Sequence, residues 1–319
     1  MSATTGSKER PTILLDCDPG LDDAVAIAVA LSLTDVVAIT TVGGNVGVDM
    51  TTQNALAVCE LIDRADVPVH PGHDEPFAGT TVQRAADVHG ARGMGDTALP
   101  LSTRAASDVR AVEAILATSY ANNDLWLVAT GPLTNIAHAV TLDPTLTERV
   151  VGVSWMGGSH TNGNVTAAAE FNAWADPEAM ATVFDAGFKR LLMHGLGVTH
   201  TVLLDDEWIA RLRITGESGD TVAATYASLL RYYRNRQGER VRLNGAAVHD
   251  ALAVLHPARP DLFTVERHRV EAIVDGGARG MTLVDRRPLA EPAAGNVDVV
   301  LAADAVAIRD IIWNSLTFH

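Results

Sequence analysis

The sequence predicts an α/β protein with a single doubly wound domain, a mainly parallel central sheet and a small hairpin extension. Strand-like and helix-like segments alternate along the chain, which is typical of βαβ units. Polar clusters begin where predicted strands end, as ligand-binding loops do in open parallel sheets. The chain has 319 residues, of which 47% are apolar, enough for one large core. We expect residues 1–10 to form a flexible tail and residues 11–319 to form one domain.

The first strand and helix are predicted within residues 12–33. Residues 12–15 have the composition of a short buried strand, and Pro19-Gly20 breaks the chain. Residues 21–33 are rich in alanine and leucine, which favours a helix. Asp22 and Asp23 then fall in the first turn of that helix.

The same alternation continues through the rest of the chain. Strands are predicted at residues 36–42, 125–129, 150–156 and 190–193, and helices at residues 51–62 and 133–140. Asp176-Pro177 is typical of a helix start, with aspartate at the cap and proline at the first helical position. Residues 270–285 differ, because two apolar runs flank Asp275-Gly276-Gly277. This pattern predicts a hairpin attached to the main sheet.

Charge and composition argue against several classes of partner. A formal net charge of −15 should repel a nucleic-acid polymer, whereas a small neutral or cationic ligand is unaffected. Cys17 and Cys59 are the two cysteines, without a C-x-x-C pair, so neither a disulfide framework nor a cysteine zinc site is expected. The longest mostly apolar run, residues 24–33, is far too short for a membrane span. We therefore expect a cytoplasmic protein.

The segment DCDPGLDD places Asp16, Asp18, Asp22 and Asp23 within eight positions. Such charges repel one another unless a cation or proton lies among them. Helix capping and the helix dipole, worth about 0.3–1 kcal/mol each, account for one or two of these acids but not for all four. The segment therefore predicts a metal site.

Calcium is the cation that best suits the available oxygen ligands, since it takes six to eight oxygens whereas zinc prefers nitrogen and sulfur. Asp18 and Asp23 supply carboxylates, the carbonyl of Thr130 at a strand end supplies a neutral oxygen, and Asp250 completes the set. Asp250 follows His249 at a predicted helix start, where adjacent side chains point about 100° apart. His249 can then face another part of the cavity, and an imidazole can protonate a leaving group near neutral pH.

A glycine-rich loop followed by polar residues, GGSHTNGNVTAAAEFN, covers residues 157–172. Asn164, Glu170 and Asn172 suit a polyhydroxylated ligand such as a glycan or nucleoside, because each hydroxyl needs donors and acceptors. On composition alone, asparagines that only shape turns fit about equally well. The segment HGARGMG, which begins at His89, suits either a closing lid or an idle surface loop. The sequence assigns no role to His70, His73, His138, His160, His194, His200 or His256.

Seven segments together resemble the inosine-uridine nucleoside hydrolase family, in family order and over residues 11–285. They are DCDPGLDD, VGGNVG, HGARGMG, ATGPLTNIA, MGGSHTNGNVTAAAEFNAWADPEA, VHDALAV and ARGMTLVD. The resemblance implies a nucleoside hydrolase-like catalytic domain that hydrolyses the N-glycosidic bond of ribonucleosides with bound Ca²⁺. The products would be ribose and a free nucleobase, and the protein would be a homodimer or homotetramer.

The resemblance also implies residue roles. Asp18 resembles the calcium ligand that serves as general base and activates the metal-bound water, Asp23 and Asp250 resemble further carboxylate ligands, and Thr130 the carbonyl ligand. His249 resembles the acid for the departing base. The implied substrate-binding residues are Asp22, Asn45, His89 near the nucleobase, Met156 beneath the sugar, Asn164, Glu170, Asn172 and Asp250. Because the purine-specific branch tends to carry tryptophan at position 249, the histidine there favours a nonspecific or pyrimidine/inosine-preferring enzyme.

Two departures from the family pattern leave base specificity open. Arg92 stands where the family often has an acid, and residues 226–244 do not align with the family's helix-borne aromatic. Other readings also remain. A haloacid-dehalogenase-like phosphatase shares the D-x-D start but needs a threonine soon after, where this chain has Pro19-Gly20-Leu21. A non-catalytic ribose- or nucleoside-binding protein and a hydrolase of modified nucleosides are the remaining alternatives.

Overall fold

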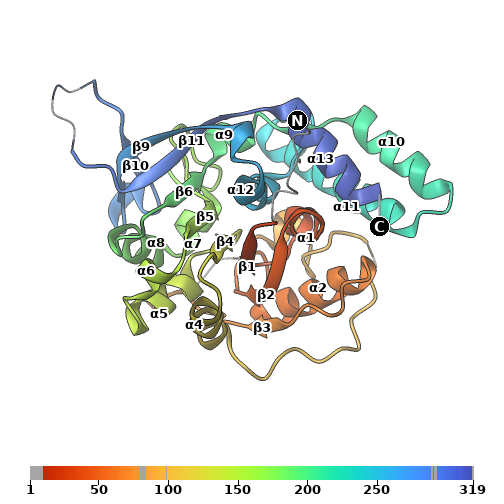
Figure 1. The fold of residues 1–319 in the computed structure, drawn as a ribbon. Coiled ribbons are helices and arrows are strands. Elements are labelled where there is room, and N and C mark those ends of the chain that lie inside the picture. Colours follow the sequence, from red (N-terminus) through yellow and green to blue (C-terminus); the bar gives the residue numbers. More distant parts are fainter. Residues whose placement is uncertain (1–9, 79–83, 98, 289, 291–292, 318–319) are drawn as a thin grey trace, which may run out of the picture.

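The computed structural model describes residues 10–78, 84–97, 99–288, 290 and 293–317 (Figure 1). Apart from Arg10, the tail expected over residues 1–10 lies outside this part of the chain. The strands are β1 (Thr12–Cys17), β2 (Asp35–Thr41), β3 (Val69–Pro71), β4 (Trp126–Ala129), β5 (Gly152–Met156), β6 (Leu191–His194), β7 (Leu203–Leu204), β8 (Ala246–Ala247), β9 (Phe263–Ala272), β10 (Thr282–Asp285) and β11 (Val297–Ala303). 

The helices alternate with these strands over most of the chain. They are α1 (Leu21–Leu33), α2 (Val48–Leu61), α3 (Ala86–His89), α4 (Ala111–Ala121), α5 (Thr134–Leu142), α6 (Leu146–Arg149), α7 (Phe171–Ala175), α8 (Pro177–Asp185), α9 (Leu196–Thr199), α10 (Asp206–Glu217), α11 (Thr221–Val241), α12 (His249–Ala258), α13 (Ala305–Thr317) and the 3-10 turns Pro260–Leu262 and Gly276–Ala278. None of the described helices is long and apolar enough to cross a bilayer.

Within the described residues, nine strands form the central sheet, in the order β10-β9-β11-β6-β5-β4-β1-β2-β3. Neighbouring strands are parallel from β11 to β3, whereas β9 and β10 continue the sheet in antiparallel pairing. This confirms the predicted doubly wound α/β sheet. It also confirms the predicted hairpin, because β9 pairs with β10 and attaches through β11 to the main sheet.

The strand order reverses at β1, because β2 and β3 lie on one side of it and β4, β5 and β6 on the other. The carboxyl ends of β1 and β4 are adjacent there, with Asp16 paired to Ala129. The segments that follow both strands therefore leave the sheet at the same edge. In open parallel sheets such a switch point is where ligands bind.

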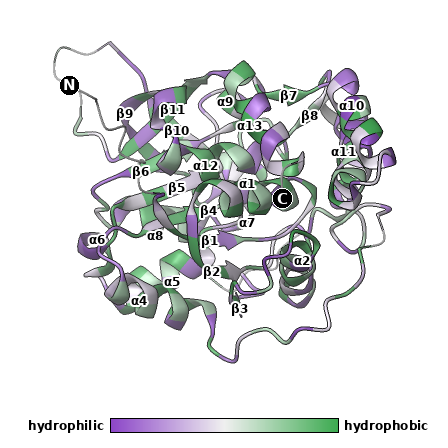
Figure 2. Ribbon diagram, turned by 45° about the vertical axis from the view of Figure 1, so that its right-hand side comes forward, coloured by the Kyte–Doolittle hydropathy of each residue, from purple (hydrophilic) through white to green (hydrophobic). Residues whose placement is uncertain are grey.

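Helices cover both faces of the sheet, with α1, α2 and α12 on one side and α4, α5 and α8 on the other (Figure 1). Alternate residues of β1 supply two cores, since Ile13 and Leu15 belong to one apolar cluster and Leu14 to the other. At the periphery, α10 carries both hydrophilic and hydrophobic residues (Figure 2). Only one side of such a helix needs to be buried.

Several element boundaries differ from the sequence-based prediction. The predicted helix at residues 21–33 matches α1, but α2 begins at Val48 rather than at residue 51. The earlier start has a physical cause, because Asp74 Oδ1 accepts the Val48 N–H at 2.6 Å and caps the first turn. The first strand continues beyond residue 15 because Cys17 still pairs with Thr41 of β2.

Candidate active site

A cavity of about 410 Å³ lies at the switch point of the sheet. It is lined by the predicted site residues Asp18, Asp22, Asn45, His89, Thr130, Met156, Asn164, Glu170, Asn172, His249 and Asp250. Asp23 is fully buried next to Asp22. The structure therefore brings together residues that are spread over more than two thirds of the sequence.

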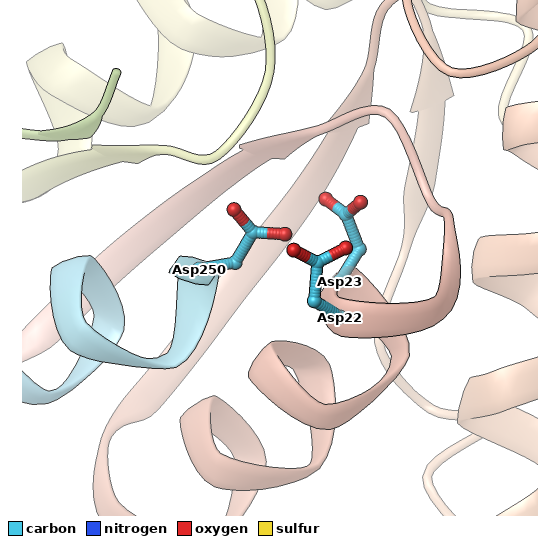
Figure 3. Close-up of side chains that lie close together, drawn as sticks. All are labelled: Asp22, Asp23 and Asp250. Carbon is cyan, nitrogen blue, oxygen red and sulfur yellow. The ribbon is translucent and has the colours of Figure 1, made fainter. Parts of the chain in front are cut away.

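Three carboxylates converge beside this cavity. Asp22 and Asp23 come from the first turn of α1 and Asp250 from the first turn of α12, and one oxygen of each lies within 4.8 Å of the others. Figure 3 shows the three side chains pointing toward one another. An all-oxygen group of this kind suits a hard cation such as Ca²⁺ or Mg²⁺. Asp22, which the sequence analysis assigned to the sugar, thus lies in the cluster that can hold a metal ion.

Neighbouring donors fix the carboxylate of Asp23. Its Oδ2 accepts the Gly20 N–H at 2.9 Å and the Asn45 amide at 3.2 Å, while its Oδ1 accepts the Thr130 hydroxyl at 2.8 Å. The bond to Gly20 closes the amino-terminal turn of α1. Burial raises the pKa of Asp23, and the Gly20 N–H acts in the opposite direction by stabilising the ionised form.

Asp18 has one carboxylate oxygen held and one unpaired. Its Oδ2 accepts the Asn45 N–H at 2.7 Å, whereas its buried Oδ1 has no hydrogen-bond partner among the described residues. The approach of the neighbouring loop is close, since a Cβ on Gly44 would lie 2.1 Å from Asp18 Oδ2. Glycine at position 44 therefore allows the loop to contact this carboxylate.

Negative charge accumulates at this end of the cavity. Burial, followed by the charge of Asp23, raises the pKa of Asp22 to about 8 and that of Asp18 well above its usual value. Burial, followed by the charges of Asp22 and Asp23, also raises the pKa of Asp250 well above its usual value. A divalent cation would offset both the desolvation and the repulsion. The unpaired Asp18 oxygen and the carboxylate cluster thus fit a cation site.

The side-chain amide of Asn172 links two strand ends across the floor of the cavity. It donates to the carbonyl of Thr130 at 2.7 Å and to the carbonyl of Met156 at 3.0 Å. A carbonyl oxygen has two lone pairs, so this bond leaves Thr130 able to bind a cation as well. Asn172 therefore holds the ends of β4 and β5 at a fixed distance from each other.

Glu170 is anchored by backbone donors at the start of α7. Its carboxylate accepts the N–H groups of Gly158 at 2.8 Å, Asn172 at 2.9 Å and Ala173 at 3.1 Å. Burial raises the pKa of Glu170 to about 7, while these N–H groups favour its ionised form. Asn164 differs, because its buried Oδ1 has no partner among the described residues and remains available to a ligand.

Hydrogen bonds determine the tautomers of the two cavity histidines. His89 Nδ1 accepts the Leu21 N–H at 3.1 Å, so the proton of the neutral ring lies on Nε2. Gln237 Oε1 accepts the Ala247 N–H at 2.8 Å, so the Gln237 amide nitrogen donates to His249 Nε2 at 3.2 Å. The proton of His249 then lies on Nδ1, which contacts the Thr199 hydroxyl at 2.7 Å.

Both histidine rings are neutral at physiological pH in this arrangement. Burial lowers the pKa of His89 to about 3, and burial, followed by the charges of His200 and His89, lowers that of His249 to about 3. An acid role for His249 therefore requires a ring that gains a proton or exchanges its contact with Gln237.

Sequence reasoning missed part of the cavity wall. Tyr233 and Gln237 project from α11, which was not assigned as an element, and His200, for which no role was expected, lines the cavity with its ring centroid 5.4 Å from that of His249. The available signal for this helix was a segment of good helix formers, and the tyrosines and Gln237 within it were the signal for a contribution to the cavity. The other lining residues outside the prediction are Arg84, Ala85, Asp87, Val88, Val165, Phe171 and Trp174.

The fold and the cavity define an α/β protein with a candidate cation site at its topological switch point. Comparison with known proteins identifies its family. The model of the inosine-uridine preferring nucleoside hydrolase family matches residues 13–310, so the chain belongs to this family of N-ribohydrolase enzymes. This confirms the resemblance carried by the seven sequence segments.

Individual relatives are similar over nearly their whole length. A pyrimidine-specific ribonucleoside hydrolase RihA from Shewanella woodyi is 38% identical, over 96% of this chain and 98% of the relative. A pyrimidine-specific ribonucleoside hydrolase RihB from Escherichia coli is 35% identical, over 93% and 94%. The solved structure of a purine-preferring ribonucleoside hydrolase from Gardnerella vaginalis superposes with a TM-score of 0.89 at 30% identity, covering 96% of this chain and 98% of that one.

Proposed function

We propose that this chain hydrolyses the N-glycosidic bond of ribonucleosides with bound Ca²⁺, prefers pyrimidine ribonucleosides, and releases ribose and a free nucleobase. One observation carries the proposal in a chain of this family. Asp18, with its unpaired oxygen, lines the same cavity as Asp22 and Asp250, which form the carboxylate cluster with Asp23. Amide, carboxylate and imidazole groups suited to a sugar and a base line the rest of that cavity.

The cation would be held by Asp18, Asp23, Asp250 and the carbonyl of Thr130. When bound, it would supply positive charge that orients the attacking water and the 2′- and 3′-hydroxyls of the ribose. Asp22, with its Oδ2 held by the Tyr233 hydroxyl at 2.9 Å, is proposed to accept a hydrogen bond from the sugar. Asn45, Asn164, Glu170 and Asn172 would hold the remaining hydroxyls, and Met156 would contact the sugar from beneath.

The chemical step exchanges one bond for another at the anomeric carbon. The water oxygen bonds to that carbon as the bond to the base nitrogen breaks, and the electron pair leaves with the base. Asp18 accepts a proton from the water, and the carboxylates around the sugar stabilise the positive charge that develops on the ribose. The base gains a proton. His249 is the proposed donor, once its neutral ring has itself taken up a proton, and His89 is a neighbouring contact.

Pyrimidine preference is supported by the relatives rather than by the geometry. The two pyrimidine-specific relatives share 38% and 35% identity with this chain, compared with 30% for the purine-preferring one. Tyr233, Gln237 and His200 line the cavity around His89 and His249, and we propose that they face the base.

The test is the release of free base from inosine, adenosine, guanosine, uridine and cytidine, measured with and without a calcium chelator. We expect uridine and cytidine to give the highest kcat/KM, chelation to abolish turnover, and added Ca²⁺ to restore it better than Mg²⁺. Faster hydrolysis of purine nucleosides would overturn the base preference, and full activity after exhaustive chelation would overturn the metal assignment. Ribose binding without base release would favour the non-catalytic alternative.

The sequence-based expectations of a homodimer or homotetramer and of a cytoplasmic location remain proposals. Sedimentation equilibrium on the full chain tests the first, since a monomer mass at micromolar concentration contradicts it. Fractionation of expressing cells tests the second.

A further inference from the structure

The residues that lead from the turn of the β9–β10 hairpin into β10 contact the segment that carries the sugar-facing residues. Three residues make these contacts, Arg279, Gly280 and Thr282, and we call them the hairpin clamp. They belong to ARGMTLVD, one of the seven segments that carry the family resemblance. None of the three is among the described residues that line the cavity. Their contacts lie at three points between residues 158 and 178.

Thr282 makes the first contact. Its hydroxyl accepts the Ser159 N–H at 2.8 Å and donates to the Ser159 carbonyl at 2.7 Å, so one side chain satisfies both backbone groups of one residue. Both residues are buried. The fit extends to Gly158, whose φ is +67° and whose added Cβ would lie 2.6 Å from Thr282 Cγ2. Only glycine tolerates this combination of backbone angle and contact.

Gly280 and Arg279 make the second and third contacts. The φ of Gly280 is +83°, and an added Cβ would lie 2.6 Å from Trp174 Cα, so the hairpin backbone packs directly on α7. The guanidinium of Arg279 pairs with both oxygens of Glu178 in the first turn of α8, at 2.6 and 3.1 Å. Bidentate pairing of this kind fixes direction as well as distance.

The clamped segment contains Asn164, Glu170 and Asn172, all of which line the cavity. Glu170 returns to Gly158, the neighbour of Ser159, through the hydrogen bond of 2.8 Å. The Thr282 hydroxyl therefore holds the chain at the point where the sugar-facing loop leaves β5. Without it, Gly158 keeps its bond to Glu170 and still accepts the Leu196 N–H at 3.1 Å, but Ser159 loses both backbone bonds to the hairpin.

We propose that Thr282 is a positioning residue for ribose binding, acting through Ser159 and Gly158 on Glu170 and Asn164. This inference rests on the proposed function. Small displacements of binding groups reduce activity strongly, by up to about 100-fold for a 1 Å shift. A displaced loop weakens the binding of the sugar equally in the ground state and in the transition state. KM should therefore rise more than kcat falls.

The test compares Thr282→Ala with Thr282→Ser, which differ only by the hydroxyl. For Thr282→Ala we expect the KM for uridine to rise about tenfold with a smaller change in kcat. We also expect faster amide hydrogen exchange in residues 157–170. Thr282→Ser should stay within about twofold of wild type in KM and retain slow exchange. Thr264→Ala, at an exposed position of β9, is the control for a change elsewhere on the hairpin.

Each outcome decides the proposal. Equal KM values and equal exchange in the alanine and serine variants would overturn it, as would faster exchange at an unchanged KM. Wild-type protein that hydrolyses no nucleoside would refute the proposed function and the positioning role together. Active wild-type protein with identical variants would refute the positioning role alone. The Tm of each variant is measured so that kinetics are compared on folded protein.

Discussion

Tyr233 donates its hydroxyl proton to Asp22 Oδ2 at 2.9 Å, joining α11 to the first turn of α1 although 211 positions separate the two residues. The tyrosine is buried, and its ring lies 5.5 Å from that of His89 at an angle of 39°. Burial and the charge of Asp22 raise the pKa of Tyr233 well above its usual value, so the hydroxyl remains a donor. It therefore fixes one oxygen of Asp22.

Tyr233→Phe should lower kcat/KM for uridine roughly 10- to 100-fold, because a hydrogen bond to a charged group contributes about 1.5–3 kcal/mol. Tyr226→Phe is a matched control on the same helix, since Tyr226 is equally buried but donates to the carbonyl of Ala24 at 3.0 Å, outside the cavity lining. Steady-state kinetics and Tm on both variants check this. Equal kinetic losses would contradict a specific role for the Asp22 contact.

Asp18→Ala should abolish detectable turnover of a p-nitrophenyl riboside, a loss of at least ~10²–10⁴-fold, because the proposed base and a proposed cation ligand disappear together. Asp310→Asn is the control, because it removes one negative charge at an exposed position of α13. This variant should retain activity. Release of p-nitrophenolate reports both rates. Turnover similar to wild type in Asp18→Ala would refute the assignment of Asp18.

His249→Ala should separate substrates by their leaving groups. p-Nitrophenolate leaves without protonation, so the variant should keep substantial activity on the riboside. Uridine and inosine should lose about 10²–10⁴-fold in kcat, because their bases leave as protonated species. The ratio of the two rates is the measurement. A uniform loss on all three substrates would show that His249 acts in binding or folding instead.

Gly44→Ala should strongly reduce activity, because the added methyl would lie 2.1 Å from Asp18 Oδ2 and must displace that carboxylate. We expect a loss of about 10²-fold in kcat/KM. Gly47→Ala is the matched control in the same loop, where the added Cβ meets only Asp74 Oδ1 at 3.5 Å. It should keep its activity and lose at most about 1 kcal/mol of stability at the helix cap. Comparable kinetics for the two variants would argue against steric crowding at Asp18.

Protonation of His256 should lower the free energy of unfolding as the pH decreases from 6.5 to 4. Burial lowers the pKa of His256 to about 4 and that of His194 well below its usual value, so these two side chains bind more protons in the unfolded chain than in the folded one in this window. His256→Phe keeps the ring stacked on Phe263, 4.7 Å away, but cannot be protonated. Its stability should therefore depend less on pH, by up to about 3 kcal/mol. Denaturant unfolding at pH 7, 5.5 and 4 checks this, and parallel curves for the two proteins would contradict it.

Local patterns predicted the parts of the fold that depend on short-range signals. The break at Pro19-Gly20 and the alanine-rich run after it predicted α1 with its observed ends, and Asp275-Gly276-Gly277 predicted the hairpin. The sequence also predicted which edge of the sheet carries the site, because the polar loops come directly after parallel strands. These inferences needed only periodicity and turn chemistry.

Long-range contacts were not accessible in the same way. Spacing alone did not reveal that Asp22, rather than Asp18, has an oxygen within the cluster formed with Asp23 and Asp250, because side-chain direction depends on the backbone angles after Pro19. The role of α11 was also missed, since its mixture of charged, small and aromatic residues gives no clear apolar face. Its contribution to the cavity depends on the packing of Tyr233 against α1.

The carboxylate cluster combines two neighbours from the first turn of α1 with Asp250 from the start of α12. A nascent chain that has emerged only as far as α11 can form most of the parallel strands but lacks the third acid. The site is therefore completed late in synthesis, and a premature stop codon before position 250 yields a product that cannot assemble it, however well its amino-terminal strands fold.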